Sequence, residues 1–381
     1  MVKGMKQTEI GWIPEDWEVN PLYTLVSKIA SGKSNTSHYP NEQFPIYGST
    51  GIIGTKNYYD YEGEKITVAR VGANAGHLNL INGYYCISDN TLFIKVNDRI
   101  KIEYLHKYLQ SINLNQYVFG SGQPLITGTI LKNLIIPLPP LPEQEVIAGA
   151  LSDADAWIES LEQLIAKKRL IKQGAMQELL TPKEGWEVKK LGEVGEIITG
   201  GTPSTLVAEY WSGDIPWITP TDINIKKDIY VGERNLTVSG LSQIRKLRKN
   251  SLLVTCIASI GKNAILRVDG ACNQQINAIT PNANFSVNYL YYLLELNKNI
   301  LIGKAGTTAT LILSKAEFSL IEFLFPSLTE QTRIATILSD MDAELEALEQ
   351  QLHKARQIKQ GMMQELLTGR IRLNYDASDG L

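Results

Sequence analysis

Apolar residues recur at steps of three and four along two stretches of the chain, residues 143–180 and 330–367. This spacing is typical of a long amphipathic or coiled-coil helix. Prolines end the preceding chain just before each stretch and set the start of each helix. At about 1.5 Å per residue, each helix would be about 57 Å long. The predicted seam residues are Ala154, Trp157, Leu161, Leu164 and Ile171 in the first helix and Met341, Leu345, Leu348, Leu352 and Ile358 in the second.

The two stretches are copies of one another. At an offset of 187 residues, 25 of the 39 positions paired between 143–181 and 330–368 are identical, without a gap. The similarity continues outside them, because Trp17 and Leu22 recur as Trp186 and Leu191 at an offset of 169. An internal repeat of this kind predicts two tandem halves. The expected parts are a first domain at 1–142, a helix at 143–180, a second domain at 181–329, a helix at 330–367 and a tail at 368–381.

Charge predicts how the two helices pair. In each copy a run of acidic residues precedes a run of basic ones, so antiparallel pairing sets each acidic half against the basic half of the other helix. One exposed ion pair contributes only about 0 to 1 kcal/mol, but the whole pattern can select an orientation. We expect an antiparallel pair with the two domains at opposite ends. The alternative is two independent helices, each packed on its own domain.

Composition places the chain among globular proteins that are not exported. Its 381 residues are 44% apolar, no run is long enough to span a membrane, and the first residues lack the apolar core of a signal peptide. The three cysteines are widely spaced without a C-x-x-C, and the four histidines form no ligand pair, which disfavours disulfides and zinc. We therefore expect a cytoplasmic protein without a metal.

The net charge of −3 is unevenly distributed. Each helical stretch has 7 acidic and 4 basic residues, so the two together carry −6 and the rest of the chain carries +3. This sign is the one expected if the domains meet a polyanion and the helices meet protein.

Each globular part reads as mixed α/β. Strands rich in β-branched residues at 65–70 and 251–256 run into small-residue loops, and helices follow near 101–113 and 287–299. Further Gly-rich loops lie at 120–123 and 303–308. Such loops suit close approach to phosphate and hydrogen bonding to base edges, although ordinary turns have the same composition. Trp217 is more readily explained as a core residue than as a contact. The candidate DNA-binding residues are Ser49, Thr50, Arg70, Asn74, His77, Ser121, Gln123, Thr219, Asp222, Ser259, Lys262, Gln274, Thr307 and Thr308.

An enzymatic function has little support in the sequence. There is no nucleotide-binding P-loop, no H-E-x-x-H and no methyltransferase motif of the Asn-Pro-Pro-Tyr type. Phe119-Gly120-Ser121-Gly122 matches a cofactor-binding glycine loop only in part, and Glu187-Val188-Lys189 lacks the upstream aspartate of a nuclease motif. A coiled-coil scaffold without DNA contact is a third possibility, but it does not explain two unlike, loop-rich domains.

Several motifs resemble those of the specificity subunits of type I restriction–modification systems. They are Pro-Leu-Pro-Glu-Gln at 140–144, Leu-Thr-Glu-Gln at 328–331, the two Lys-Gln-Gly-x-Met-Gln-Glu-Leu-Leu-Thr segments that end at Thr181 and Thr368, the Trp-Glu-Val segments at Trp17 and Trp186, and the stretches that begin at Ile46 and Ile215. The resemblance covers nearly the whole chain. It implies an α+β fold in which two mixed α/β target-recognition domains, in a pseudo-twofold arrangement, are separated by two long antiparallel coiled-coil helices.

The resemblance also implies a function. Each domain would read one half of a bipartite, asymmetric site in double-stranded DNA. The helices would space the domains and dock two methyltransferase subunits of an adenine methyltransferase/endonuclease complex, with restriction subunits joining later. This chain would be non-catalytic and would bind no cofactor, while S-adenosylmethionine and ATP with Mg²⁺ would bind to partner subunits. Residues 1–16 and the C-terminal tail would lie together.

Overall fold

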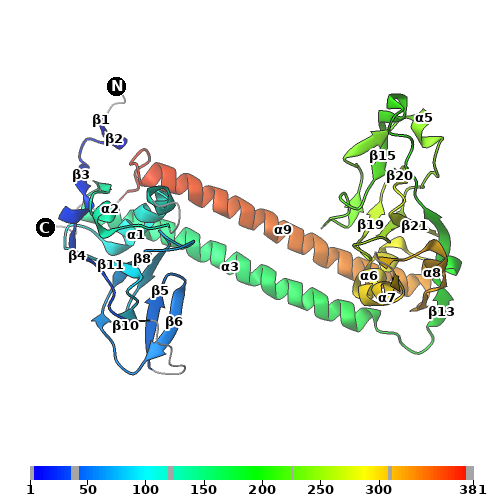
Figure 1. Cartoon of the computed structure of the whole chain (residues 1–381), viewed down its shortest axis with the longest axis horizontal. Coiled ribbons are helices and arrows are strands. Elements are labelled where there is room, and N and C mark those ends of the chain that lie inside the picture. The colour runs from blue at the N-terminus through cyan, green and yellow to red at the C-terminus, as the bar shows by residue number, and fades with distance from the viewer. Residues whose placement is uncertain (1–3, 36–42, 119–123, 225, 308–310, 375–381) are drawn as a thin grey trace. The chain divides into compact units, whose positions relative to one another are not determined.

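The computed structural model describes residues 4–35, 43–118, 124–224, 226–307 and 311–374. The chain divides into two compact units, one made of Met1–Gln163 with Gln350–Leu381 and the other of Leu164–Glu349. Two long helices, α3 (Leu141–Leu180) and α9 (Leu328–Leu366), each contribute one half to each unit (Figure 1). None of the described helices is long and apolar enough to cross a membrane.

The first domain contains two four-stranded sheets. The larger one, counted by the residues in its strands, is antiparallel throughout, and in the smaller one the central pair β5–β10 is parallel. The larger sheet has the order β4 (Val26–Ser31), β11 (Thr91–Val96), β8 (Lys65–Ala69), β9 (Leu78–Ile81). The smaller sheet has the order β6 (Gly51–Lys56), β5 (Phe44–Gly48), β10 (Tyr84–Ile87), β7 (Tyr61–Glu62). The remaining elements are β1 (Met5–Thr8), β2 (Gly11–Pro14), β3 (Glu18–Pro21), η1 (Leu22–Thr24), α1 (Ile102–Ser111), η2 (Leu114–Tyr117), α2 (Gly128–Lys132) and β12 (Ile135–Leu138).

The second domain repeats this plan with five strands in the larger sheet and three in the smaller. The larger sheet has the order β14 (Gly195–Thr199), β21 (Ile276–Pro281), β18 (Ser251–Thr255), β19 (Asn263–Leu266), β16 (Asp228–Ile229), and the smaller has the order β17 (Arg234–Leu236), β15 (Trp211–Ile218), β20 (Ala271–Cys272). The remaining elements are β13 (Glu187–Lys190), α4 (Leu191–Val194), η3 (Ala208–Tyr210), α5 (Val238–Leu241), α6 (Val287–Leu296), α7 (Lys298–Gly303), β22 (Gly306–Thr307), β23 (Leu311–Ile312), α8 (Lys315–Leu320) and β24 (Glu322–Phe325). The predicted mixed α/β character of both domains is confirmed.

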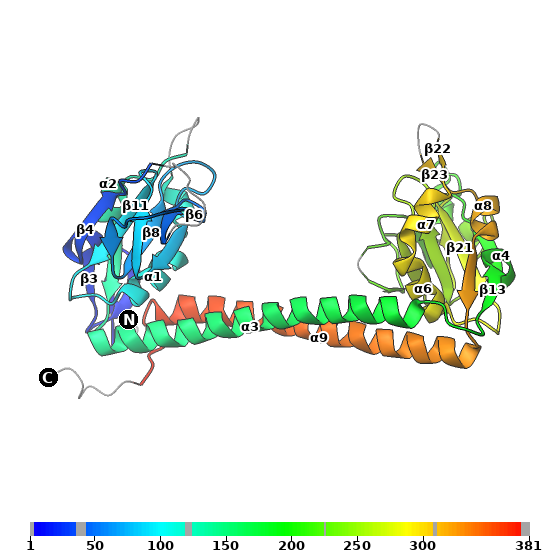
Figure 2. The ribbon, with the colours of Figure 1, turned by 90° about the horizontal axis from the view of Figure 1, so that it is seen from below.

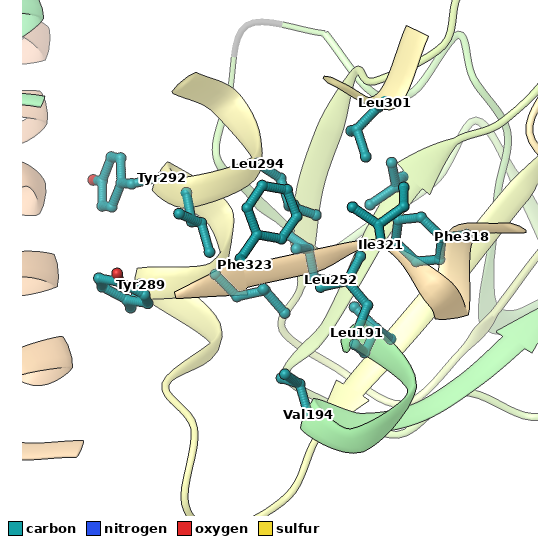
Figure 3. Packing of buried hydrophobic residues seen from close by; sticks show 14 of the residues in the cluster. Leu191, Val194, Leu252, Tyr289, Tyr292, Leu294, Leu301, Phe318, Ile321 and Phe323 are labelled. Carbon is teal, nitrogen blue, oxygen red and sulfur yellow. The ribbon is translucent and has the colours of Figure 1, made fainter. Parts of the chain in front are cut away.

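The core of the second domain lies between its larger sheet and its helices. Figure 3 shows Leu191, Leu294, Leu301 and Phe318, from four different helices, gathered around Leu252 of β18. All five side chains are fully buried. Trp217 is also buried, at 4% exposed, which confirms its predicted role as a core residue.

A buried amide explains why the glutamine at the start of each long helix is identical in the two copies. Gln144 donates to the Pro139 carbonyl (2.8 Å) and accepts from the Lys101 N–H (2.8 Å). Gln331 does the same with Pro326 (2.9 Å) and Ser286 (2.9 Å). Since a buried amide without partners would be costly, each glutamine fixes the start of its helix against its own domain.

Within each unit the halves of α3 and α9 run antiparallel and pair by charge, as predicted. In the first unit Arg356 contacts Glu162 (2.5 Å) and Lys359 contacts Asp155. In the second unit acidic and basic residues again pair across the two helices: Lys168 with Glu344 (2.6 Å), Arg169 with Glu349 (2.6 Å) and Lys172 with Asp342. The basic half of each helix therefore faces the acidic half of the other.

The predicted seam is wrong at four positions. Trp157, Leu164 and Ile171 of α3 and Ile358 of α9 are between 38% and 46% exposed. In α3 the predicted seam residue Leu161 is buried, as expected. Ile158 (half-buried) and Ile165 (buried), however, turn inward in place of Trp157 and Leu164, so the prediction is one residue out of phase at these positions. An α-helix has 3.6 residues per turn and drifts against a strict heptad, and lysine stems can fill inward positions. The other predicted seam residues, Ala154, Met341, Leu345, Leu348 and Leu352, are half-buried.

The chain just after α9 lies against the N-terminal segment, as expected. Arg372 donates to both carboxylate oxygens of Asp16 (2.8 Å each) and to Glu143 at the start of α3 (2.6 and 2.8 Å). Glu143 is fully buried and also accepts from the Trp17 indole N–H (3.0 Å). These hydrogen bonds from Arg372 hold the pKa of Asp16 below its ordinary value. The tail is thus attached to the first domain by an ion-paired cluster.

Candidate nucleic-acid interface

In the first domain, four loops meet at the end of strand β8. The N–H of Arg70, the residue after β8, donates to the Asn90 carbonyl (3.1 Å), and the Arg70 carbonyl accepts from Ile126 (2.9 Å). The N–H of Ser88 donates to Tyr47 in the β5–β6 hairpin (2.9 Å). We call residues 47–50, 70–77, 88–90 and 124–126 the strand-end surface of the first domain.

The second domain builds an equivalent surface after strand β18. The N–H of Cys256 donates to the Gln275 carbonyl (2.8 Å), and the Cys256 carbonyl accepts from Leu313 (2.8 Å). The N–H of Asn273 donates to Ile218 at the end of β15 (2.9 Å). Residues 218–222, 256–262, 273–275 and 311–313 form this second strand-end surface. Strand β23 belongs to this surface, and it lies on the side of the domain away from α9 (Figure 2).

The predicted contacts in the first domain occupy different parts of its strand-end surface. Ser49 (half-buried) and Thr50 (exposed) form the tip of the β5–β6 hairpin. Asn74 and His77 are exposed and line a shallow hollow of about 490 Å³ that α1 and Lys359 also border. The guanidinium of Arg70 lies 3.5 Å from the Ser31 hydroxyl, and its buried Nε has no hydrogen-bond partner among the described residues. Two predicted residues, Ser121 and Gln123, lie outside the described residues.

A buried lysine, the last residue of β6, joins the β5–β6 hairpin to neighbouring segments. Lys56 is 6% exposed and donates to Tyr58 (2.9 Å) and to Ser34 (3.2 Å). Ser34 in turn donates to Asp60 (2.8 Å). The hydrogen bond with Tyr58 raises the pKa of Lys56 despite its burial. The ammonium therefore keeps its positive charge beneath the hairpin that carries Ser49 and Thr50.

In the second domain two of the predicted contacts, Thr219 and Asp222, are bonded to one another. Thr219 donates through its hydroxyl (2.7 Å) and its N–H (2.8 Å) to Asp222, so this pair also stabilises the turn after β15. Gln274 is exposed and its amide oxygen accepts from Thr202 (2.6 Å). The other predicted contacts are Ser259 and Lys262, both exposed in the loop after β18, Thr307 in β22, and Thr308, which lies outside the described residues.

Two basic features of the second domain were missed by sequence reasoning. Arg234 is exposed and stacks on Trp211, with its guanidinium carbon 3.7 Å from the ring centre. The segment 245–249 has four exposed basic residues around the buried Leu247. This run was a visible signal in the sequence, because clustered lysines and arginines are typical of nucleic-acid contact. No such signal marks Arg234, whose partners come from a different strand.

The described part of the chain offers no metal site beside these surfaces. Within it, no group of three or more His, Cys, Asp or Glu side chains could hold a metal ion. Cys86, Cys256 and Cys272 are buried and unpaired, and burial raises the pKa of the Cys256 thiol to about 11. What the surfaces offer is hydroxyls, amides, basic side chains and loop backbone, which suit hydrogen bonding to a nucleic acid.

Comparison with known families identifies these two domains. The family model of the type I restriction modification DNA specificity domain matches residues 14–168 and, a second time, residues 183–357. The chain belongs to this family. It carries two copies of the specificity domain, and the two matches cover most of its length.

Some relatives within the specificity-domain family align with nearly the whole chain, and others align with one part of it. A putative type I restriction enzyme MjaX specificity subunit of Methanocaldococcus jannaschii is 26% identical, and the alignment covers 97% of both chains. The MjaIX specificity subunit of the same organism is 38% identical over 167 residues, which are 42% of this chain and 38% of that protein.

The fold is also similar to that of a solved structure. The crystal structure of a type I restriction-modification system S subunit from M. genitalium aligns with a TM-score of 0.66 at 17% identity, over 96% of this chain and 99% of that one. Identity at this level shows that the fold is shared. The predicted family and the predicted fold class are therefore confirmed.

Proposed function

We propose that this chain is the sequence-specific DNA recognition subunit of a type I restriction–modification complex, and that each domain reads one half of a bipartite, asymmetric target. The observation that carries this proposal is the strand-end surface, which is built twice by the same backbone contacts but with different side chains. The first copy has Arg70 where the second has Cys256. The loop after β5 offers Ser49 and Thr50, and the corresponding loop after β15 offers Thr219 and Asp222. Two surfaces with different side chains suit two different half-sites.

The long helices would set the spacing between the half-sites. A helix of 40 residues, such as α3, is about 60 Å long at about 1.5 Å per residue. This length is comparable with one to two turns of B-DNA, at about 34 Å each. The ion pairs between α3 and α9 within each unit would make the pair stiff enough to measure such a distance.

The same helices are the proposed docking site for two methyltransferase subunits, with restriction subunits joining the complex afterwards. Support comes from the separation of charge, because the two helical stretches carry −6 and the remaining chain +3. We propose that this chain is non-catalytic, and that S-adenosylmethionine and ATP with Mg²⁺ bind to the partner subunits of an adenine methyltransferase/endonuclease complex.

Binding of the assembled complex to defined duplexes tests the proposal. The chain purified with its methyltransferase partners should shift a duplex that carries the bipartite site, and it should bind poorly to duplexes with either half scrambled or with two base pairs added between the halves. Equal binding to all of these duplexes would refute bipartite recognition. Methyl transfer from S-adenosylmethionine by the chain alone would refute the non-catalytic assignment.

A further inference from the structure

Arg234 of the second domain is held in one orientation by two tryptophan rings. Its guanidinium carbon lies 3.7 Å from the centre of the Trp211 ring and 5.4 Å from that of Trp217. The two rings meet edge to face, with their centres 5.1 Å apart. Both indoles are themselves anchored, because Trp211 donates to the Ser204 carbonyl (3.1 Å) and Trp217 to the Gly201 carbonyl (2.9 Å). The arginine thus rests on a fixed aromatic platform.

The N–H groups of this guanidinium are available to a ligand. Arg234 is exposed, and no hydrogen bond or ion pair joins its side chain to any other described residue. Stacking occupies one face of the guanidinium plane and leaves the N–H groups at its edge free to donate. An arginine that serves only the fold is commonly satisfied by a carboxylate or a carbonyl, as Arg267 is by Asp228 (2.6 Å).

Arg234 lies at the border of the strand-end surface of the second domain. It is the first residue of β17 and pairs with Trp217, one residue before the end of β15. The N–H of the preceding residue, Glu233, donates to Asp222 (2.8 Å), which also accepts from Thr219. Arg234 therefore directly follows a residue whose backbone is bonded to Asp222, one of the candidate contacts that the sequence indicated.

We propose that Arg234 is a specificity-determining residue that reads a guanine in the half-site of the second domain, with its N–H groups donating to O6 and N7 of the base. This inference rests on the proposed function. A planar fork fixed by stacking matches the two acceptors of guanine in the major groove, and the stacking reduces the entropy lost on binding. Contact with phosphate needs no such fixed plane and is better supplied by exposed flexible residues such as Arg248.

Among the described residues, the first domain has no counterpart of this arginine. In the smaller sheets, Tyr47 and Ile218 occupy equivalent positions, because their carbonyls accept the corresponding N–H groups of Ser88 and Asn273. The residue before Tyr47 is Ile46, whose antiparallel partner is Gly54, where the second domain has Trp217 and Arg234. An arginine held by two tryptophan rings would therefore recognise guanine in the half-site of the second domain and not in that of the first.

The test compares Arg234→Gln and Arg234→Lys with the unchanged chain, each in the full complex with its methyltransferase partners. Methylated adenines are mapped across the genome of cells that carry each version, and exchange of residues 21–137 identifies which half-site belongs to the first domain. Arg248→Gln is the matched control, because it removes one exposed positive charge from the same domain. Competition binding then measures the discrimination against other bases at the guanine and the dependence of affinity on salt.

Both Arg234 variants should relax the target at one guanine of the second domain's half-site and leave the other half unchanged. Discrimination at that position should fall by about 5- to 150-fold. Arg248→Gln should leave the preferred base unchanged.

Three results would overturn the inference: an unaltered target in both variants, no guanine at the relaxed position, or an affinity loss that is equal for all sequences and lowers the salt slope by about 1, which indicates a phosphate contact. If the unchanged chain yields no bipartite target at all, the proposed function fails and the inference with it.

Discussion

Arg372 allows the attachment of the C-terminal tail to be tested by a single substitution. In Arg372→Met the side chain keeps its length but loses its charge, and among the described residues the fully buried carboxylate of Glu143 keeps the Trp17 indole as its one partner. Removal of one member of a buried ion pair costs about 3 to 5 kcal/mol. Because the Arg372 side chain is 35% exposed, water can partly replace it, and we expect the free energy of unfolding of the first unit to fall by about 3 kcal/mol.

A second substitution should relieve most of this loss. Glu143→Gln removes the buried charge, while its amide oxygen can still accept from Trp17. The double variant should therefore be more stable than Arg372→Met alone, with a coupling energy of about 2 kcal/mol between the two sites. Arg370→Met is the control, since Arg370 is 62% exposed and its contact with Glu365 is long, at 3.7 Å. Its removal should change stability by less than about 0.5 kcal/mol.

Native-state hydrogen exchange is the appropriate assay, because a chain with two compact units need not unfold in one step. Peptides from residues 11–21 and 141–150 should report the destabilisation, and peptides from the second domain should not. The reasoning is refuted if Arg372→Met changes the exchange of these peptides no more than Arg370→Met does. It is also refuted if Glu143→Gln brings no recovery.

Three further predictions concern stability. Burial lowers the pKa of His106 to about 4, so His106 stays neutral in the folded state while in the unfolded chain it takes up a proton below about pH 6.5. The free energy of unfolding of the first unit should therefore fall by up to about 3 kcal/mol between pH 6.5 and 4. In unfolding measured as a function of pH, His106→Phe should flatten that slope. Lys172→Asp should destabilise the helix pair of the second unit by about 1 kcal/mol, and Asp342→Lys in the same chain should restore part of it in thermal unfolding; no restoration would contradict the observed pairing. Gln144→Leu should weaken the first unit and Gln331→Leu the second, each by about 2 kcal/mol, as measured by hydrogen exchange; an effect on the wrong unit would count against the repeat.

The repeat made the architecture accessible from the sequence. One chain that holds two copies shows which positions are retained, and Gln144 and Gln331 are retained because each satisfies buried backbone groups at the start of a long helix. The antiparallel orientation could be predicted for a similar reason, since the order of acidic and basic residues along each helix is visible without coordinates. Lys172 and Asp342 then meet in the expected sense.

The sequence does not reveal which face of a long helix turns inward, or which side chains meet when they lie far apart along the chain. The predicted seam placed Trp157 and Leu164 inside, whereas one-residue phase differences in a helix follow from packing that a pattern of letters does not record. The role of Arg234 could not be predicted, because the two rings that it contacts, Trp211 and Trp217, belong to a strand about twenty residues earlier in the chain. The contact between Arg372 and Glu143 is more distant still along the sequence.

The central claim is that each domain reads its own half of the target. It is tested most directly by exchanging residues 21–137 for the corresponding segment of another family member and mapping methylated adenines genome-wide in cells that carry the hybrid chain and its partner subunits. The account predicts a new sequence in one half-site, with the other half-site and the spacing between them unchanged. A simultaneous change in both half-sites, or no change in either, would contradict it.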